Sequence, residues 1–599
     1  MNKIRINILL FFFSFSLISG YAQQVRPDTT INAAGGNIFH HTVERGQTVY
    51  SIATMYGVTE NDIYRLNPGS KESIKAGAVL VIPQKDASSR TDVSTEDIYT
   101  YHTIQPKETL YSLTVKYNIP AAALVEANPG LSVETFTIGK IIRIPPTKID
   151  DLPQTEVKTV TKEIEYRVQS KETMYSICRK FNVSSAELTR INPKLKQGVK
   201  AGMILKIPVK TDETVVSTVV APQEKEVNAL LSAPKMIDRV NTIKVVLMLP
   251  FMAKESTRSE ASLRFIEYYE GLLLAVDSLR NTGVSIELSV FDTESGTNRT
   301  KEILKTKELK EANLIIGAVQ NDQIALVAEF AKKHKIKYVI PFTSRNDDVL
   351  SNAYVFQVNT PHSYLHDKAA QLGCRLFANA NIIFVNTNDK DNKTDYIKTL
   401  KEEMNQRNIT YTDCIWSDEN FRADITAKLD ENRSNVIIPY SGSFDALNKI
   451  RTTLRSLSDE FPQYGLTLYG YPEWQTYTRD CLEDFFALNT HIYSYFYADN
   501  ISAQVNDFYA KYKTWYSKTL INSFPKYGIL GFDTGMYFLT ALNKYGTNFE
   551  NNLSKIKYKS LQTSFDFHRV NNWGGFINTQ LLLVNYRKDF TITREEVEL

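Results

Sequence analysis

Hydrophobic and polar residues follow two different patterns along the chain. In the first third, the run His41-Thr42-Val43 alternates like a strand, and the apolar positions from Val49 to Tyr56 recur at helical spacing. From Ile243 onward, buried-strand runs such as Ile243–Leu249 alternate with longer amphipathic stretches such as Leu263–Leu279. The pattern therefore predicts small mixed units first and a larger α/β part after them.

The first third contains one template three times. The copies run from His41 to Pro83, from His102 to Pro146 and from Tyr166 to Pro208. In each copy a tyrosine precedes an asparagine by 17 residues, in the pairs Tyr50 and Asn67, Tyr111 and Asn128, and Tyr175 and Asn192. This fixed spacing identifies an internal repeat.

Each copy is expected to fold in the order strand, helix, helix, strand. A threonine stands before each first helix, where its hydroxyl can cap backbone N–H groups; these are Thr48, Thr109 and Thr173. In the first copy Gly57 breaks the first helix, Asn67-Pro68 ends the second, and Val79–Ile82 forms the closing strand. About 45 residues lie near the lower size limit for an independent core, so each unit should be only modestly stable.

The three segments resemble the LysM domain, a module that binds N-acetylglucosamine polymers such as peptidoglycan and chitin. The matching pieces are Gly46 to Ile52, Asn67-Pro68 and Ile82-Pro83, with equivalents in the other two copies. The resemblance implies a shallow glycan groove between the loop before the first helix and the loop after the second. It assigns glycan binding to Gly46, Gln47, Thr48, Val49, Asn67, Pro68, Gly69, Thr109, Leu110, Asn128, Pro129, Thr173, Met174, Asn192 and Pro193. Capping chemistry favours the alternative that the repeated Thr and Asn are mainly structural.

Polar stretches without clear periodicity separate the copies. We expect LysM modules at residues 39–84, 99–146 and 164–208, and a linker at 209–240. The stretches 85–98 and 147–163 are also interpreted as flexible linkers. The modules should then behave as independent beads on one chain. Binding of one module raises the effective concentration of the others near the glycan, so several weak contacts give a higher net affinity.

The remainder, residues 241–599, is predicted to form two α/β lobes. Strands alternate with helices in two series, which indicates parallel sheets with right-handed crossovers. The first series ends near Ile340 and the second begins at Asn381. Helices are expected at 303–309 and 425–431, among others.

This part resembles the type I periplasmic-binding-protein fold of branched-chain amino acid receptors. The matching pieces are Ile243 to Phe251, Asn313 to Ala318, Tyr338 to Ser344, Tyr354 to Pro361, and Trp573 to Asn578 with the strand that follows it. The resemblance implies a ligand between the lobes, at Ala318, Gln320, Asn321, Thr343, Ser344, Asn386, Tyr440, Ser441 and Glu473. The usual hydroxyl is absent from the segment 317–320 and the usual Tyr-Gly from 386–389, so an amino acid ligand is not supported. Many relatives with this fold act as interaction domains instead.

The composition excludes some classes of protein, and the first residues predict export. The 599 residues are 43% hydrophobic and 23% charged, with a net charge of +3, which gives no sign of nucleic-acid binding. Four cysteines exclude a disulfide-built scaffold.

A secretory signal peptide is predicted over residues 1–22, with an uncleaved anchor as the alternative. The evidence is the positive start at Lys3 and Arg5, the apolar run Ile8–Ile18 and the small residues around Ala22. The mature chain is expected to be periplasmic or secreted, without a transmembrane segment.

Catalytic and cofactor motifs are missing. The sequence has neither a GxSxG elbow nor an HExxH pair, and no cofactor or metal is implied. His362 and His366 lack a third ligand, and one disulfide among Cys374, Cys414 and Cys481 is left open. Alternating Tyr493, Tyr495 and Tyr497 either line the predicted cleft or pack in the core, and core packing is the more frequent case.

These patterns favour a non-catalytic, exported, peptidoglycan-binding protein. Its C-terminal part would recruit or regulate a partner in the cell envelope, such as a cell-wall synthase or hydrolase. The alternative is a wall-tethered solute receptor that passes amino acids or muropeptides to an importer. A peptidoglycan hydrolase is a distant third hypothesis, because no catalytic motif supports it.

Overall fold

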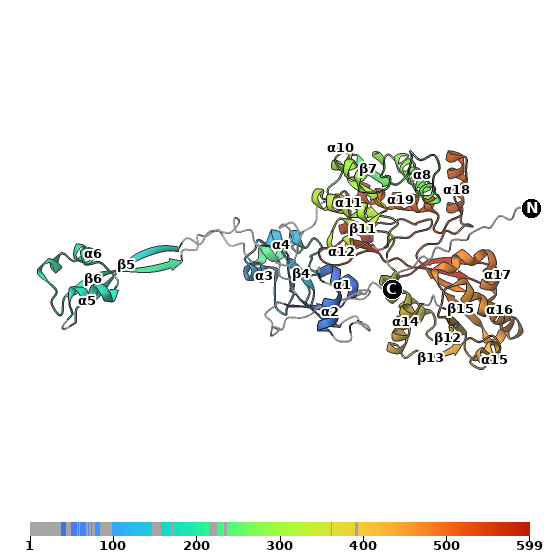
Figure 1. Cartoon of the computed structure of the whole chain (residues 1–599), viewed down its shortest axis with the longest axis horizontal. Coiled ribbons are helices and arrows are strands. Elements are labelled where there is room, and N and C mark those ends of the chain that lie inside the picture. Colours follow the sequence, from blue (N-terminus) through green and yellow to red (C-terminus); the bar gives the residue numbers. More distant parts are fainter. Residues whose placement is uncertain are drawn as a thin grey trace, which may run out of the picture. The chain divides into compact units, whose positions relative to one another are not determined.

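The computed structural model of the protein describes residues 38–43, 49–56, 58, 60–67, 70, 74, 78–83, 99–146, 157–169, 172–181, 183–214, 224–232, 237–344, 346–360, 362–389 and 393–598 (Figure 1). The chain forms two compact units. The larger contains Met1–Glu108, Ala122–Ile144 and Leu231–Leu599, and the smaller contains Thr109–Ala121 and Pro145–Leu230. Each unit is described by itself.

The first module has the expected order of strand, helix, helix and strand. It consists of β1 (Ile38–Thr42), α1 (Val49–Tyr56), α2 (Glu60–Leu66) and β2 (Val79–Pro83). The two strands pair antiparallel. The apolar positions predicted for one face of α1 are buried, and Ile52, Ile63 and Ile82 are fully inaccessible. Their burial drives this small core, because each large aliphatic side chain contributes about 1.5–3 kcal/mol when removed from water.

The second module is divided between the two units. Strands β3 (Thr100–Thr103) and β4 (Ile141–Ile144) pair antiparallel within the larger unit. Helix α3 (Leu110–Tyr117) belongs to the smaller unit, and α4 (Ala121–Ala127) lies almost wholly in the larger one.

The third module lies in the smaller unit and is longer than expected. It contains β5 (Val157–Arg167), α5 (Met174–Phe181), α6 (Ser185–Ile191), the short 3₁₀ helix η3 (Pro193–Gln197) and β6 (Ile204–Thr214). Strands β5 and β6 pair along their whole length, so the ribbon extends into both stretches that we expected to be linkers. Alternating β-branched residues at both strand ends favour extended pairing. Helix α7 (Glu224–Ala229) also falls within the expected linker 209–240, where the backbone N–H of Tyr111 donates to Asn228 Oδ1 at 3.1 Å.

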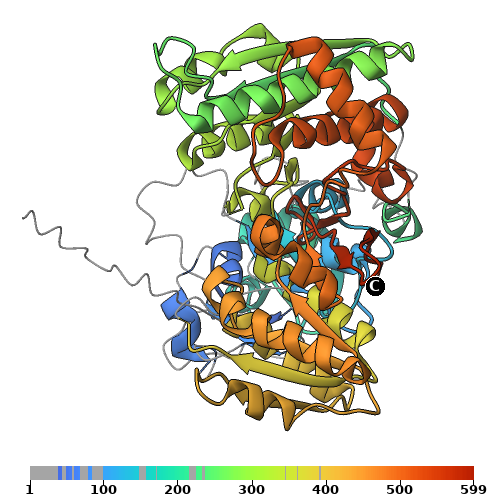
Figure 2. The same ribbon diagram turned by 90° about the vertical axis from the view of Figure 1, so that its right-hand side faces the viewer.

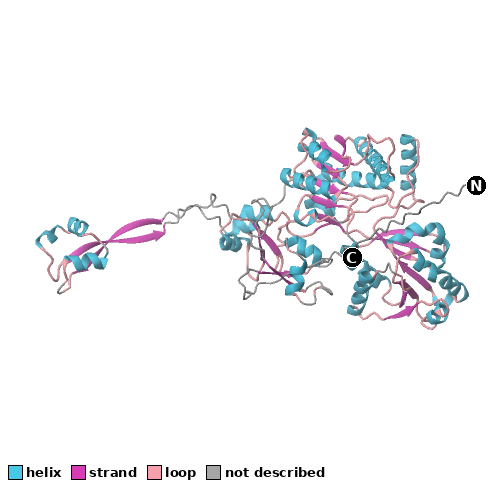
Figure 3. Cartoon of the chain, viewed as in Figure 1, coloured by secondary structure: helices cyan, strands magenta, loops and turns pink. Residues whose placement is uncertain are grey.

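Residues from Ile243 onward form two lobes, each built on a seven-stranded sheet (Figure 3). Lobe 1 has the strand order β17-β18-β11-β10-β9-β7-β8. Its strands are β7 (Ile243–Leu249), β8 (Ile286–Asp292), β9 (Leu314–Gly317), β10 (Lys337–Ile340), β11 (Val355–Gln357), β17 (Phe567–Arg569) and β18 (Phe576–Asn578). Its helices are α8 (Glu260–Arg280), α9 (Thr297–Ile303), α10 (Lys307–Lys310), α11 (Asn321–His334), α12 (Asp348–Ser351), α18 (Ala503–Tyr516), α19 (Tyr527–Tyr545) and the 3₁₀ segment η7 (Phe549–Lys555).

Lobe 2 has the strand order β13-β12-β14-β15-β16-β19-β20. Its strands are β12 (Asn381–Asn386), β13 (Tyr411–Ile415), β14 (Asn435–Pro439), β15 (Leu466–Gly470), β16 (His491–Ser494), β19 (Leu582–Tyr586) and β20 (Ile592–Glu596). Its helices are α13 (His366–Leu376), α14 (Thr394–Gln406), α15 (Phe421–Thr426), α16 (Phe444–Glu460) and α17 (Thr478–Ala487), with 3₁₀ segments η4 (His362–Leu365), η5 (Pro462–Tyr464) and η6 (Pro472–Tyr477). The first five strands of each lobe share one parallel order, in which the first strand lies between the second and the third. This is a doubly wound arrangement with helices on both faces.

The predicted lobes are confirmed, with two local corrections. The helix expected over 303–309 is broken, because α9 ends at Ile303 and α10 begins at Lys307. The helix expected over 425–431 lies earlier, at Phe421–Thr426, where Phe421 and Ile425 supply the buried positions. Short helices leave few apolar repeats, so their ends are poorly defined by pattern.

The chain crosses between the lobes three times. It passes to lobe 2 after β11, returns after β16, and passes again after β18. Helices α8 and α19 therefore come from opposite ends of the domain, and they lie side by side in lobe 1 (Figure 2). Their backbones approach so closely that a Cβ on Gly271 would lie 1.8 Å from the Gly528 carbonyl oxygen. Glycine is required at this crossing because any side chain would separate the helices.

Candidate functional site

The loop before the first helix of the second module is held by a carboxylate. Glu108 Oε2 accepts hydrogen bonds from the Gln105 backbone N–H at 2.8 Å and from His102 Nε2 at 2.6 Å. Lys107, the residue before Glu108, has a φ of 70°, in the left-handed region. In the third module Glu172 accepts in the same way from the Gln169 N–H, at 2.7 Å. Glu108 and Glu172 thus hold the same loop in the second and third modules.

The predicted threonine caps are confirmed in the second and third modules. Thr109 Oγ1 accepts from the Ser112 backbone N–H at 3.1 Å, and Ser112 Oγ accepts from the Thr109 N–H at 2.9 Å. Thr173 and Ser176 repeat this reciprocal pair at 3.2 and 2.9 Å. Of the other predicted groove residues in these loops, Leu110 is fully buried, Met174 is half-buried, and Val49 of the first module is 9% exposed. Gly46, Gln47, Thr48, Pro68 and Gly69 lie outside the described residues.

The repeated asparagine bridges the second helix and the closing strand. Asn128 is fully buried; its Oδ1 accepts from the Arg143 N–H at 2.7 Å, and its Nδ2 donates to the carbonyl oxygens of Arg143 and Leu124 at 2.7 and 2.8 Å. Asn192 makes the equivalent bonds to Lys206 and Leu188. Asn67 Nδ2 donates to the Ile63 carbonyl at 2.8 Å. The Asn128 and Asn192 amides therefore shape the loop, and Pro129 and Pro193 follow them at its partly exposed surface.

In lobe 1 the predicted cleft residues make contacts within their own lobe. Ala318 is 1% exposed and packs in the core. Gln320 Oε1 accepts from the Gly296 N–H at 3.2 Å, and Thr343 Oγ1 donates to the Val319 carbonyl at 3.1 Å. The Ser344 carbonyl accepts from Gln357 Nε2 at 2.8 Å. Asn321, the first residue of α11, is exposed.

Lobe 2 shows the same behaviour. Glu473 forms an ion pair with Lys393 at 2.5 Å. The Tyr440 hydroxyl donates to Asp413 at 3.0 Å and accepts from Lys401 at 2.8 Å. Ser441 Oγ accepts from the Ser443 N–H at 3.1 Å, and Asn386 Oδ1 accepts from the Asn388 N–H at 2.9 Å. The structure thus gives most predicted cleft groups a partner in the same lobe.

An apolar cavity of about 230 Å³ lies beside the segments that connect the lobes. Phe342 and Tyr527 stack in its wall with ring centroids 5.4 Å apart, and Tyr495 and Asn359 also line it. Sequence reasoning missed this cavity. Two signals pointed to it: the Pro341-Phe342 pair directly before the predicted Thr343, and Tyr495, which was named as a possible cleft residue.

The alternating tyrosines and the cysteines are mainly structural. Strand β16 ends at Ser494, so only Tyr493 lies on it, and Tyr493 is 3% exposed in the core of lobe 2. Tyr495 and Tyr497 pack against the same core from outside the strand. All four cysteines are free thiols, and burial raises the pKa of Cys374 to about 11. Among the described residues, no group of three or more His, Cys, Asp or Glu is placed to hold a metal ion.

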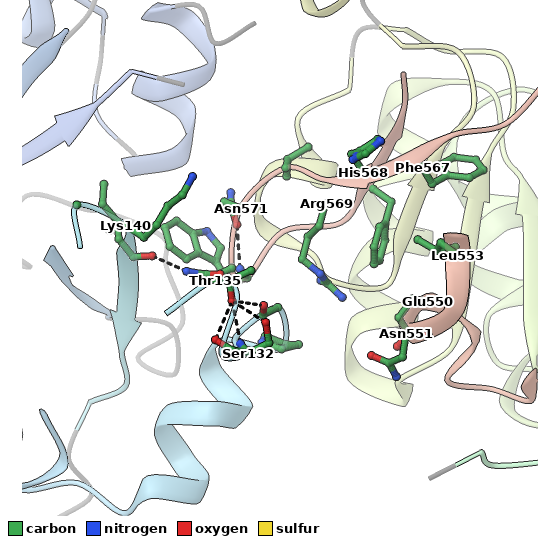
Figure 4. Close-up of a pocket in the computed structure, with 18 of the residues that line it drawn as sticks. Ser132, Thr135, Lys140, Glu550, Asn551, Leu553, Phe567, His568, Arg569 and Asn571 are labelled. Carbon is green, nitrogen blue, oxygen red and sulfur yellow. Dashed lines mark hydrogen bonds between the residues drawn. The ribbon is translucent and has the colours of Figure 1, made fainter. Parts of the chain in front are cut away.

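A second cavity, of about 410 Å³, lies between the second module and lobe 1, inside the larger unit (Figure 4). The module contributes the loop after α4, including Pro129, Gly130 and Lys140, and lobe 1 contributes the segment around β17. The Gly130 N–H donates to the Asn572 carbonyl at 2.7 Å, and Asn572 Nδ2 donates to the Ile141 carbonyl at 3.0 Å. These two bonds join a predicted glycan-binding loop to the C-terminal lobe.

Trp573 extends this contact to the first module. It is 2% exposed and belongs to the same hydrophobic cluster as Ile52 and Ile63. Its ring centroid lies 5.3 Å from that of Tyr101 and 5.0 Å from the guanidinium carbon of Arg143. The expectation of independent beads is therefore wrong for the described parts of the first two modules, because apolar burial against a shared tryptophan joins them.

Comparison with known proteins identifies the repeats. Residues 41–83, 102–145 and 166–208 each match the LysM domain family. The chain is 32% identical over 108 residues to a protein of Bacillus subtilis (strain 168) named as a sporulation-specific glycosylase, YdhD, and 26% identical over 115 residues to an autolysin of Enterococcus faecalis. The matches cover 18% and 19% of this chain, and 22% and 15% of those proteins, so the chain spans less than a quarter of either relative. Both fall within the LysM region.

Solved structures similar to the rest of the chain include substrate-binding proteins of ABC transporters. An ABC transporter substrate-binding protein from Desulfitobacterium hafniense has a TM-score of 0.37 at 13% identity, covering 59% of this chain and 100% of that one. A branched-chain amino acid ABC transporter protein from Rhodospirillum rubrum has a TM-score of 0.43 at 11% identity with the same coverage.

The chain thus contains three LysM peptidoglycan-binding domains and a C-terminal α/β domain. The two parallel-rich sheets and the three crossings between them are consistent with a periplasmic-binding-protein-like domain. Within the described residues, no helix has both the length and the hydrophobicity needed to cross a bilayer.

Proposed function

We propose that the protein is exported and binds N-acetylglucosamine-containing glycan of the cell wall through its LysM domains. The three LysM matches and the predicted signal peptide support this proposal. Several weak sites on one chain raise the net affinity for a polymer that repeats the same sugar. Because Asn128 and Asn192 are occupied inside their modules, the glycan would contact mainly the backbone groups of the adjoining loops.

The C-terminal domain acts in partner recruitment or in the regulation of cell-wall processes, without catalysis of its own. The observation that carries this part is the pairing of the predicted cleft groups within each lobe, above all Glu473 with Lys393. A ligand would have to replace these bonds and would gain little in exchange. A wall synthase or hydrolase is the kind of partner that such a domain would position.

The alternative is a receptor for a small solute. The 230 Å³ cavity near the lobe connections favours it, since aromatic walls with a few polar groups are typical of ligand sites. Its lining by Phe342, Tyr495 and Tyr527 would suit an apolar or aromatic group.

Two measurements on the full mature chain test these functions. For the first, the chain is sedimented with purified peptidoglycan, in competition with chitohexaose or with cellohexaose, which lacks the acetamido groups. Release by chitohexaose alone is expected, and failure to sediment would contradict wall binding. For the second, thermal unfolding is followed with amino acids, short peptides and muropeptides. A ligand at 100 times its Kd would add about 2.7 kcal/mol. A saturable shift abolished by Phe342→Ala would favour the receptor.

A further inference from the structure

The 230 Å³ cavity lies where all three crossings between the lobes meet. Its lining includes parts of the crossing after β11, of the crossing after β16 and of the crossing after β18; these are residues 358–360, 495–496 and 580. None of the residues that the sequence predicted for the cleft lines this cavity. It is therefore a different place from the predicted cleft.

The cavity also touches the cores of both lobes. Leu530 of α19 belongs to the core of lobe 1, and Leu365 of η4 belongs to the core of lobe 2. They are 5% and 3% exposed. The two cores are separate hydrophobic clusters. A molecule in the cavity would thus contact both lobes and every segment that joins them.

The lining indicates the chemistry of such a molecule. Phe342 and Tyr527 stack in the wall, and among the described residues that line the cavity none is charged. An ionised ligand would lose its hydration without gaining a compensating charge, whereas an aromatic ring would gain from apolar burial. An apolar cavity of about 150 Å³ is enough to hold benzene. The cavity therefore suits one neutral ring with a small substituent.

One buried hydroxyl in the lining lacks a partner. Thr360 is 4% exposed, and no described residue forms a hydrogen bond with its Oγ1. The neighbouring Asn359 is occupied, because its Nδ2 donates to the Phe342 carbonyl at 2.6 Å. A buried polar atom without a partner is unfavourable, so a ligand with one hydrogen-bonding group should bind better than a plain hydrocarbon.

We propose that this cavity is a regulatory site, which binds a small neutral aromatic molecule with one hydrogen-bonding group and thereby fixes the angle between the lobes. Binding shifts the lobes toward the arrangement in which the molecule makes most contacts. The inference deepens the regulatory role proposed for the C-terminal domain and rests on it. It requires no amino acid in the predicted cleft.

Three probes of one shape test the ligand class on the full mature chain. At neutral pH benzamide is uncharged, benzoate is an anion and benzamidine is a cation. The affinity measured by calorimetry should be about tenfold higher for benzamide than for either ion, because the lining offers no charge to an ion. Equal affinities for the three probes would overturn the ligand class, and no binding of benzamide would overturn the site.

Two variants place benzamide in the cavity. Thr360→Val keeps the shape of the side chain but lacks the hydroxyl, so the affinity should fall by about three- to tenfold. Leu530→Phe adds volume to the lobe 1 wall and should abolish binding; if it unfolds the chain, Thr360→Val keeps the test valid. Thr300→Val is the matched control, because Thr300 in α9 is also buried without a hydroxyl partner among the described residues and lies outside the lining. Full binding by both cavity variants, or an equal loss in the control, would place the probe elsewhere.

Hydrogen exchange tests the effect on the lobes. Benzamide should slow exchange in all three crossings, and protection of only one crossing would contradict the control of the lobe angle. Sedimentation with peptidoglycan is measured on the same samples. Sedimentation without benzamide binding would overturn only this inference, whereas benzamide binding without sedimentation would overturn only the proposed wall binding. The two failures are thus distinguishable.

Discussion

The guanidinium carbon of Arg143, in the closing strand of the second LysM domain, lies 5.0 Å from the ring of Trp573, in the C-terminal domain. The same carbon lies 4.9 Å from the ring of Tyr99, and Arg143 is only 8% exposed. A buried cation on aromatic faces is stabilised by the ring quadrupoles, by about 2 kcal/mol or more when desolvated. This stack links two domains that are more than 400 residues apart in the sequence.

Trp573→Ala should uncouple the first LysM domain from lobe 1. Loss of a buried tryptophan costs about 3–5 kcal/mol, and here it also removes the surface on which Arg143 rests. Hydrogen exchange should accelerate in α1, whose residue Ile52 shares the Trp573 cluster. Trp515→Ala is the matched control, because Trp515 is 47% exposed and should change stability by no more than about 0.5 kcal/mol. Unchanged exchange in α1 would show that Trp573 does not join the domains.

Gly130→Val should separate the second LysM domain from lobe 1 without unfolding the LysM fold. The added side chain would meet Arg569 and the Asn572 carbonyl, which lie 2.6 and 3.0 Å from the Cβ position. The third domain already carries Lys194 at the equivalent position, so the fold itself does not require glycine there. We expect faster proteolysis of the β17–β18 segment. Lys194→Ala should have no such effect, and protection equal to the parent chain would contradict the contact.

Asn128→Ala should destabilise the second domain more than Asn192→Ala destabilises the third. Asn128 is fully buried, and its removal strands the Arg143 N–H and carbonyl, at about 1–3 kcal/mol for each unpaired group. Asn192 makes the same bonds nearer to solvent, where water can replace them. Denaturant unfolding measures both losses. If glycan affinity falls further than the unfolded fraction explains, the asparagine also contacts sugar.

The stability of the first domain should fall as the pH rises from about 4.5 to 7. Burial raises the pKa of Glu60 to about 7 from its ordinary value of 4.5, and Glu60 is 7% exposed. The folded state therefore binds more protons than the unfolded state between these values, so deprotonation favours unfolding. The other domains have Ala121 and Ser185 at this position.

Glu60→Gln tests this dependence. The amide cannot ionise, so thermal unfolding of the first domain should become nearly flat between pH 5 and 8 and should occur at a higher temperature at pH 8. A pH dependence that persists in the variant would assign it to another group.

The sequence predicted those structural features that depend on residues close together in the chain. Thr109 and Ser112 are three residues apart, so a cap could be predicted from composition and spacing alone. The lobes could be predicted because central strands such as β7 and β12 are mostly apolar runs. The domain interface could not, since Asn572 and Ile141 are 431 positions apart and neither residue type signals a partner. Trp573 was expected only as part of a closing strand.

The cleft prediction shows a second limit. The resemblance located Glu473 and Tyr440 in lobe 2, but not their partners, because Lys393 and Lys401 are separated from them by 80 and 39 positions. Glu473 and Tyr440 could face a ligand, but each is already bonded to a lysine of its own lobe. No sequence motif includes these lysines. The ribbon of β5 and β6 was missed for a different reason, because polar composition outweighed a weak alternation.

The sheet of lobe 2 is complete only after the chain has crossed from lobe 1 for the last time, after β18. Strands β19 and β20 cover the edge of β16 in lobe 2, and they follow all the other strands of the domain in the sequence. Until they arrive, β16 presents unpaired backbone groups that can pair with a neighbouring chain. A chain cut before β19 would keep all three LysM domains but would expose this edge of β16, so it should aggregate.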